Sequence, residues 1–280
     1  PEIDDYYEPF TFDYEHLQSA PESKAAPTAR PRSLITGERM QKIGFAWIEL
    51  PVRPGFACQP ETIERDLPEA AKVLGDYGVG ILNVTVDLPL TDERLYAACA
   101  AAGVTLNRVM FRRGDRNYWE AEDDARHQLD EALPLCERYK VRLGVQNHAG
   151  DFVGVNAMTL YHLLEDYDVQ YVGAIWDAAH EALEGMEPEP ALDIVADMLH
   201  IVNLKNGYWR RMSGPEAEVA EWKTYWTSGR QGRANWPRVI AKVKEMGYTG
   251  PICLTAEYSD EHSIDRLIAE DLAFAKSLLV

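Results

Sequence analysis

Four short apolar runs in the second half of the sequence each end in polar residues whose types can do chemistry. These residues are Gln146, Asn147, His148, Asp177, Asn203, Lys205, Asn206 and Glu257. Carboxylate and imidazole groups can take up and return protons, and a lysine ammonium can orient or protonate an oxygen. A single polar residue after a strand is more commonly a solvated loop residue. Four clusters in succession, one per run, indicate one shared site.

A repeating pattern of apolar runs and amphipathic stretches has to position these residues. The predicted strands span residues 45–50, 79–86, 104–111, 141–146, 171–176, 199–204 and 251–256. Helical periodicity predicts helices over residues 62–74, 93–102, 120–139 and 236–246, and Gly75, Gly103 and Gly247 stand where helices would end. Alternation over residues 8–14 gives a weak eighth strand. Strands that alternate with helices are typical of a parallel sheet.

Seven strands and a weak eighth fit a single α/β domain, a (β/α)8 TIM barrel, better than an open doubly wound sheet. An open sheet usually carries a glycine-rich phosphate turn after an early strand, and this sequence has none. We expect the barrel over residues 33–280 and an irregular N-terminal extension and linker over residues 1–32. In such a barrel the site lies where the strands end. Strand alternation puts Asn203 and Lys205 on one face, so the polar groups can converge.

Composition and charge exclude several classes of function. The chain has 280 residues, 46% hydrophobic and 26% charged, with a net charge of −18, so nucleic acid is not an expected partner. No apolar run has the length of a membrane helix and no start resembles a signal peptide, so we expect a cytoplasmic protein without a membrane partner. The cysteines at 58, 99, 136 and 253 lack metal or disulfide spacing, which predicts buried thiols.

Four segments carry a family resemblance. They are VRLGVQNH at 141–148, YVGAIWDAAH at 171–180, LHIVNLKN at 199–206 and GYTGPICLTAEY at 247–258. The sequence over about residues 40–270 resembles the sugar phosphate isomerase/epimerase superfamily, the xylose isomerase-like TIM barrels. These include ketose 3-epimerases, inosose dehydratases and dehydroshikimate dehydratases. The strongest part of the resemblance is Asp177 with His180, the Leu-Lys pair at 204–205 and the block that ends in Glu257.

The resemblance implies one divalent cation, Mn²⁺ or Mg²⁺, held by a Glu, an Asp, a His and a second Glu. Asp177 and Glu257 match this pattern, whereas Gln146 replaces the first Glu and Asn203 replaces the His. Asn206 stands where an Asp usually follows the Leu-Lys pair. Metal affinity falls as carboxylates are lost, so Gln146, Asp177, Asn203 and Glu257 predict a weak site for a hard cation. Loss of the metal is left open.

The same resemblance implies chemistry beside a carbonyl group. Gln146 cannot titrate, so Glu257 is the expected base, with His180 and Lys205 orienting or protonating substrate oxygens. We expect an isomerase or epimerase for a sugar, keto-sugar or cyclitol, assisted by the metal. A lyase or dehydratase is the alternative, because elimination needs only one base and one acid. A second alternative is a barrel without catalysis that binds a sugar or a partner subunit.

Further polar residues are candidates for substrate binding. They are Glu49, Arg112, His148, Trp209 and Arg210. Paired donors let Arg112 hold a phosphate or a carboxylate, and Trp209 and Arg210, followed by Arg211, could form a stacking and anion-binding wall. The aromatic and basic stretch at residues 222–236 would cap the mouth of the barrel or lie at a subunit contact. A homo-oligomer is left open.

Overall fold

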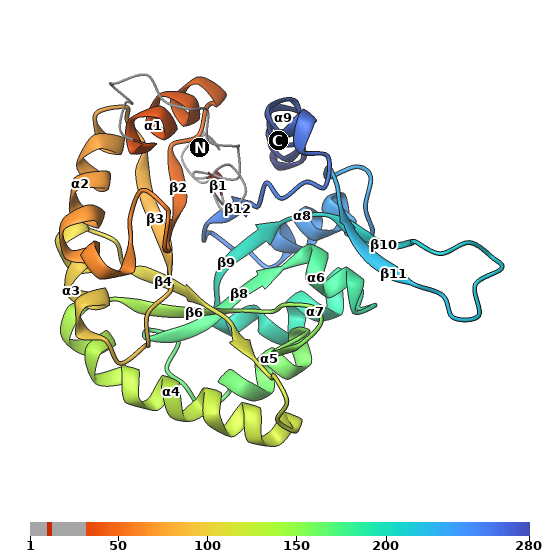
Figure 1. Cartoon of the computed structure of the whole chain (residues 1–280), viewed down its shortest axis with the longest axis horizontal. Coiled ribbons are helices and arrows are strands. Elements are labelled where there is room, and N and C mark those ends of the chain that lie inside the picture. The colour runs from red at the N-terminus through yellow and green to blue at the C-terminus, as the bar shows by residue number, and fades with distance from the viewer. Residues whose placement is uncertain (1–9, 13–31) are drawn as a thin grey trace.

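The computed structural model of the protein describes residues 10–12 and 32–280 (Figure 1). Its main sheet is parallel and curls into a barrel, with helices on the outside (Figure 1). In spatial order, its strands are β1 (Phe10–Phe12), β12 (Ile252–Leu254), β9 (Leu199–Leu204), β8 (Val172–Asp177), β6 (Arg142–Gln146), β4 (Leu106–Val109), β3 (Gly80–Val86) and β2 (Trp47–Val52). The predicted (β/α)8 TIM barrel is therefore confirmed.

The predicted strand near the start of the chain exists and belongs to the barrel sheet. β1 pairs in parallel with β12, with Phe10 opposite Ile252 and Phe12 opposite Leu254. β1 and β2 are the two edges of the sheet. Most of the predicted linker at residues 20–32 lies outside the described residues. The boundary between extension and barrel stays a prediction.

Nine helices and three short 3₁₀ turns are present among the described residues. The helices are α1 (Arg32–Ile43), α2 (Ile63–Gly75), α3 (Glu93–Ala102), α4 (Tyr118–Tyr139), α5 (Ala157–Leu164), α6 (Ala178–Leu183), α7 (Pro188–Val195), α8 (Trp236–Glu245) and α9 (Ile264–Leu279). The 3₁₀ turns are η2 (Pro60–Thr62), η3 (Ala196–Met198) and η4 (Glu261–Ser263). None of the described helices has the length and apolarity needed to cross a bilayer.

All three glycines expected at helix ends stand where a helix ends. Gly75 is the last residue of α2, and the left-handed turn after it falls at Gly78 (φ 69°). Gly103 (φ 72°) caps α3, and Gly247 (φ 64°) follows α8, both in the left-handed region that glycine adopts without strain.

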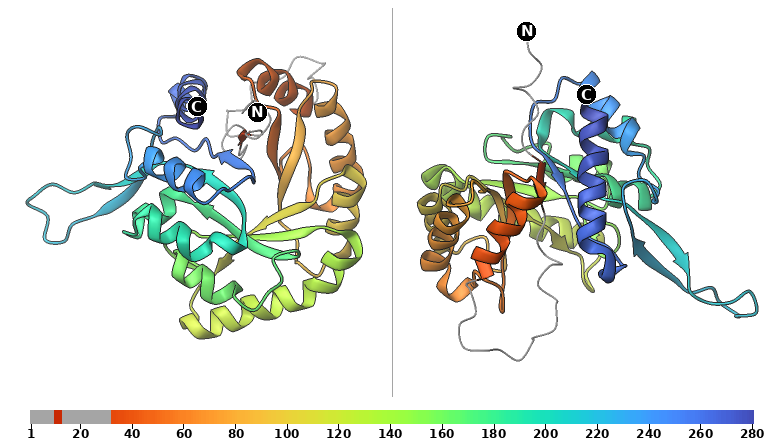
Figure 2. Two further views of the ribbon diagram at one scale, coloured as in Figure 1. Left: turned by 180° about the vertical axis from the view of Figure 1, so that it is seen from behind. Right: turned by 90° about the horizontal axis from the view of Figure 1, so that it is seen from above.

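Two small antiparallel pairs lie outside the barrel sheet. β5 (Phe111–Arg112) pairs with β7 (Phe152–Val153), and β10 (Gly207–Arg211) pairs with β11 (Trp222–Trp226). The prediction of one strand over residues 104–111 was wrong. The pairing with β6 ends where Val109 faces Val145, and the chain then turns to pair with β7. The β10–β11 hairpin projects away from the barrel as an arm (Figures 1 and 2).

Side chains inside the barrel form layers, because every second residue of each strand points inward. Leu106, Ile175, Ile201 and Cys253 pack together as an apolar floor. Gly144 leaves room for this floor, because a Cβ there would lie 2.6 Å from the Cδ1 atom of Ile175. Two residues farther along the same strands stand Arg108, Gln146, Asp177, Asn203 and Thr255, all buried. We call these five residues the polar layer.

All four cysteines are free and buried, as predicted. Packing outside the sheet is apolar, and the Trp236 ring of α8 stacks on Phe274 of α9 with 5.8 Å between ring centroids. Asp271 of α9 accepts hydrogen bonds from Gly229 N (2.9 Å) and from the Tyr258 hydroxyl (2.9 Å). This buried carboxyl group therefore holds the segment that follows β12, which carries Glu257, against α9.

The buried position of Asp271 predicts a pH-dependent contribution to stability. Burial raises the pKa of this carboxyl group to about 6, with opposing hydrogen bonds from Gly229 and Tyr258. Because the native state holds the proton more tightly, this contribution is complete below about pH 4 and is lost as the pH rises through about 6. Between about pH 5 and about pH 7.5, wild type loses this contribution, whereas Asp271→Asn has no carboxyl group to lose it from. We therefore expect the free energy of unfolding of Asp271→Asn to fall by about 1 kcal/mol less than that of wild type over this range.

Urea unfolding at several pH values measures this difference. Glu165→Gln is the matched control, because the Glu165 side chain is exposed and is not among the groups that shift the pKa of Asp271. Its curve should run parallel to that of wild type. An Asp271→Asn curve parallel to wild type would show that the Asp271 carboxyl group does not titrate in this range.

Candidate active site

Asp177 links the end of β8 to the start of α6. Its Oδ1 atom accepts hydrogen bonds from Ala179 N (2.9 Å) and His180 N (3.2 Å), so it caps two backbone groups that have no partner within the helix. The side chain is completely buried. Burial raises the pKa of Asp177, and the charge of Lys205 opposes that rise. A nearby cation is thus needed to keep the carboxylate ionised.

Gln146 joins Asp177 to a buried arginine. Its Nε2 atom donates to Asp177 Oδ2 (3.0 Å), and its Oε1 atom accepts from Arg108 Nη1. The reverse orientation of the amide would turn its NH₂ group toward the guanidinium and its oxygen toward the carboxylate. Both contacts would be repulsive, so the two neighbours fix the amide orientation.

Arg108 and Glu49 form a buried ion pair on the other side of Gln146. Arg108 Nε and Nη2 lie 2.7 and 2.5 Å from Glu49 Oε1, with side chains only 3% and 2% exposed. Thr85 (2.6 Å) and Asn83 also donate to the Glu49 carboxylate. Glu49, expected from the sequence to bind substrate, is thus the counter-charge that the buried Arg108 guanidinium needs. A contact between Glu49 and a substrate stays a prediction.

Lys205 and Glu257 meet at the end of β9 and the segment after β12. Lys205 Nζ pairs with Glu257 Oε2, lies 3.3 Å from His180 Nε2, and is 3.7 Å from the ring centroid of Trp226. The Trp236 indole donates to the Lys205 carbonyl oxygen (3.0 Å) and so fixes the backbone there. The Lys205 side chain is 4% exposed and that of Glu257 is 20% exposed. Glu257 is therefore the more accessible member of the pair.

The two histidines of the site are held neutral. Burial and the charges of Lys205 and Arg108 bring the pKa of His180 well below its usual value. Both of its ring nitrogens face N–H donors, at Ala149 N (3.3 Å) and Lys205 Nζ (3.3 Å), which disfavours a doubly protonated ring. Burial lowers the pKa of His148 to about 4, and its ring lies 3.9 Å from that of His180.

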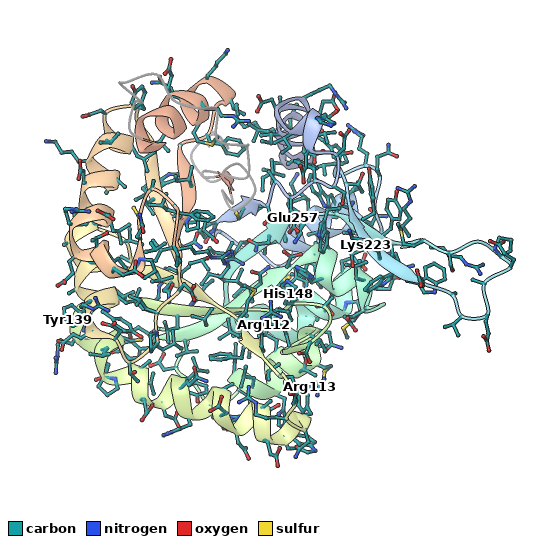
Figure 3. All side chains as sticks on the ribbon, viewed as in Figure 1. Arg112, Arg113, Tyr139, His148, Lys223 and Glu257 are labelled. Carbon is teal, nitrogen blue, oxygen red and sulfur yellow. The ribbon has the colours of Figure 1, made fainter. Side chains whose placement is uncertain are left out.

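A cavity of about 680 Å³ adjoins this network at the ends of β3, β4 and β5. Arg108, Arg112, His148 and Phe152 are among the residues that line it. The Arg112 guanidinium lies 4.6 Å from the centroid of the Phe152 ring, and within the described part of the chain no carboxylate pairs with it. Figure 3 shows Arg112, His148 and Glu257 near the middle of the barrel. The cavity can therefore present a cation to a bound small molecule.

Trp209 and Arg210 lie on β10 and do not line this cavity. The Trp209 indole donates to the Leu183 carbonyl oxygen (3.2 Å), which anchors the hairpin on α6. The Arg210 guanidinium lies 5.5 Å from the Tyr225 ring of β11. Both residues therefore belong to the outward-pointing hairpin, and their expected role in substrate binding stays a prediction.

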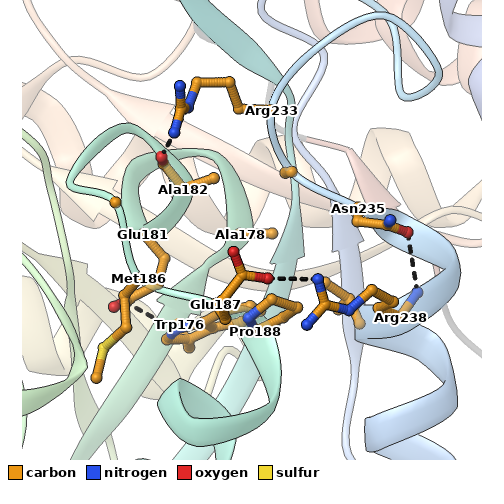
Figure 4. Close-up of a pocket in the computed structure, with 13 residues that line it drawn as sticks. Trp176, Ala178, Glu181, Ala182, Met186, Glu187, Pro188, Arg233, Asn235 and Arg238 are labelled. Atoms are coloured by element: carbon orange, nitrogen blue, oxygen red, sulfur yellow. Dashed lines mark hydrogen bonds and ion pairs between the residues drawn. The ribbon is translucent and has the colours of Figure 1, made fainter.

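A second, smaller pocket of about 150 Å³ lies between α6, α7 and α8 (Figure 4). Its polar side chains already have partners within the protein. Trp176 donates to Glu181 (3.0 Å), Arg233 donates to the Ala182 carbonyl oxygen (3.1 Å), and Arg238 pairs with Glu187. The pocket is therefore a packed junction between helices.

Sequence reasoning missed Arg108 and Trp226. Arg108 had a usable signal: it lies two residues after Leu106 in a predicted buried strand, so alternation directs it into the barrel. Trp226 gave no usable signal in the sequence, because its contact with Lys205 depends on how the β10–β11 hairpin folds back.

The expected metal ligands do not form a coordination shell in this arrangement. Gln146 turns its oxygen to Arg108, Asp177 accepts three N–H groups, and Glu257 pairs with Lys205. Among these four expected ligands, only Asn203 has a buried side-chain oxygen without a hydrogen-bond partner in the described part of the chain. Across residues 10–12 and 32–280, no group of three or more His, Cys, Asp or Glu side chains could hold an ion. The donor set therefore does not fit a divalent cation.

Two solved structures share the barrel. The D-psicose 3-epimerase with D-tagatose from Clostridium cellulolyticum H10 has a TM-score of 0.66 and 12% identity over 89% of this chain and 94% of that one. A xylose isomerase-like TIM barrel protein from Mycobacterium smegmatis, in complex with magnesium, has a TM-score of 0.67 and 18% identity over 97% and 98%. At these identities the likeness concerns the fold alone.

Curated relatives cover less of the molecule. An inosose dehydratase of Geobacillus kaustophilus (strain HTA426) is 26% identical over 163 residues, 56% of this chain and 50% of that protein. A stretch of 52 residues, 18% of this chain, is 73% identical to the respiratory nitrate reductase 2 beta chain of Escherichia coli (strain K12). The chain spans only 10% of the length of that beta chain.

The profile of the xylose isomerase-like TIM barrel family matches residues 38–278. This range begins within α1 and ends within α9, so it contains both the polar layer and the Lys205–Glu257 pair. Because the profile spans nearly the whole barrel, the protein belongs to the xylose isomerase-like TIM barrel family.

Proposed function

We propose that the protein is an enzyme that removes a proton beside the carbonyl group of a sugar, keto-sugar or cyclitol. The observation that carries this proposal is the Lys205–Glu257 pair at the strand ends. A carboxylate that remains partly accessible can act as a base, and a buried ammonium beside it can stabilise the oxygen that becomes negative. The family resemblance and the relatives named above, an epimerase and a dehydratase, support the same class of substrate.

The reaction begins with the transfer of the proton from carbon to the Glu257 carboxylate. The electron pair of the C–H bond forms a C=C bond, and the carbonyl oxygen becomes an enolate oxygen that accepts a hydrogen bond from Lys205. Asn203 Oδ1 is buried without a partner among the described residues, so a substrate hydroxyl can donate to it. His180, held neutral, limits the ways in which Lys205 can turn.

A single base favours reactions on one face of the substrate. Epimerisation needs a second group to return the proton from the opposite face, and the Gln146 amide cannot do this. Elimination needs no second base, because the enolate reforms the carbonyl while Glu257 returns the proton to the departing β-hydroxyl, which leaves as water. We therefore place a dehydratase ahead of the epimerase that the resemblance alone favours. Isomerisation on one face remains the second candidate, because it uses the same Glu257–Lys205 pair.

The proposal involves no metal, because the residues expected to hold one are bonded to protein donors and cations. A barrel without catalysis that binds a sugar or a partner subunit is the remaining alternative. Exchange of substrate protons with solvent distinguishes the proposed enzyme from a barrel without catalysis. It detects removal of the proton regardless of which product is formed.

We expect the wild-type protein to incorporate solvent deuterium into at least one member of a panel of keto-sugars and cyclitols. Glu257→Gln should reduce that rate by about 100-fold or more, because a positioned base typically contributes this much. Mass spectrometry of the recovered compounds gives the rate. Loss of water from the same compound identifies a dehydratase.

Glu261→Gln is the matched control, since Glu261 is exposed and lies four residues farther along the chain. It should exchange at the wild-type rate. Full exchange in a folded Glu257→Gln protein would place the base elsewhere. The absence of exchange across the whole panel in wild type would favour the barrel without catalysis.

Arg112 predicts a preference for substrates that carry a carboxylate or a phosphate. Arg112→Gln should raise KM for such substrates by about tenfold or more while kcat changes little, because a lost charged hydrogen bond weakens binding by this amount. Neutral substrates should be unaffected. Arg113→Gln is the control, because Arg113 already pairs with Asp151 (2.8 Å). An equal effect on charged and neutral substrates would contradict a role in anion binding.

A further inference from the structure

We infer that Arg108 and Lys205 take the electrostatic place of a divalent cation, and that the native site holds no metal ion. This inference concerns what occupies the site, so it stands or falls separately from the proposed reaction. It rests on the hydrogen-bond and ion-pair partners that the side-chain oxygens of the expected metal ligands have in the structure.

The buried charges at the centre of the barrel are neutralised by the chain itself. Glu49 pairs with Arg108, and Glu257 pairs with Lys205. Asp177 accepts one side-chain and two backbone N–H groups and is stabilised by the charge of Lys205. Buried carboxylates require such compensation, and a divalent ion would be one way to provide it. Here two side-chain cations and three N–H groups already do so.

Gln146 suits a site without metal better than a glutamate would. It accepts from Arg108 and donates to Asp177 at 3.0 Å at the same time, whereas an ionised carboxylate could only accept. A glutamate at this position would place a second carboxylate against the buried Asp177, which would require an additional cation between them. An amide at position 146 is therefore what a site without a metal ion requires.

Lys205 is held where a cation would otherwise be bound. Its ammonium contacts Glu257, His180 and the Trp226 ring, while Trp236 fixes its backbone carbonyl. A divalent ion between Asp177 and Glu257 would be repelled by this ammonium, which cannot leave without exposing the buried carboxylate. The unpartnered buried oxygens of Asn203 and Thr255 in the polar layer cannot by themselves supply a coordination shell, because hard cations take six or more oxygen ligands.

The test is metal analysis of the full-length protein, purified without chelator. We expect elemental analysis to find far less than one equivalent of Mn, Mg, Co or Zn. Neither EDTA nor about 1 mM Mn²⁺ should change Tm, because only a ligand of the native state shifts it. A stoichiometric metal, or a clear fall of Tm in EDTA, would overturn the inference. Because neither readout uses activity, failure of the proposed reaction would be seen separately.

Lys205→Met tests the role of the ammonium directly. Removal of this charge beside Asp177 and Glu257 should raise Mn²⁺ affinity in calorimetry by about tenfold or more. Lys223→Met is the matched control, because Lys223 is exposed on β11 (Figure 3), and its affinity should equal that of wild type. Lys205→Gln replaces the first variant if Lys205→Met does not fold. Unchanged affinity in a folded Lys205 variant would overturn the role assigned to this residue.

Discussion

A guanidinium buried inside a parallel barrel has to be matched by acceptors, and the centre of this molecule is arranged around that constraint. Arg108 stands above the apolar floor with its side chain 3% exposed. It takes Glu49 as its counter-charge and the Gln146 oxygen as a further acceptor. Gln146 is then oriented to donate to Asp177, which in turn starts α6. A single buried charge on β4 thus sets the geometry of three neighbouring strand ends.

This buried network also determines which side chains remain available to a substrate. With Asp177 and Gln146 committed to the network, the accessible carboxylate at the late strands is that of Glu257, and its partner is Lys205. Gln146 cannot take up or release a proton, because its side chain is an amide. The cavity beside the network is lined by arginines and a neutral histidine, and also by apolar residues, Asp87 and Asp124.

The sequence predicted the barrel and the shared location of its late strand ends, because both follow from the periodicity of single segments. Asp177, Lys205 and Glu257 were identifiable because each follows an apolar run. The roles of Glu49 and Gln146 were not, since they depend on Arg108, which belongs to another strand. The place of Trp209 and Arg210 in the fold was not identifiable for a similar reason. Only the pairing of β10 with β11 reveals that this segment points outward.

The pairing of β1 with β12 constrains how the chain reaches its native state. Phe10 leaves the ribosome well before its partner Ile252. The edge of the sheet beside β12 therefore cannot be completed until β12 has been made, and its formation requires the closure of a long loop. Contacts of such high sequence separation slow folding and leave a strand edge exposed to other chains in the meantime. Newly made molecules should thus depend most on chaperones after the last strand has been synthesised.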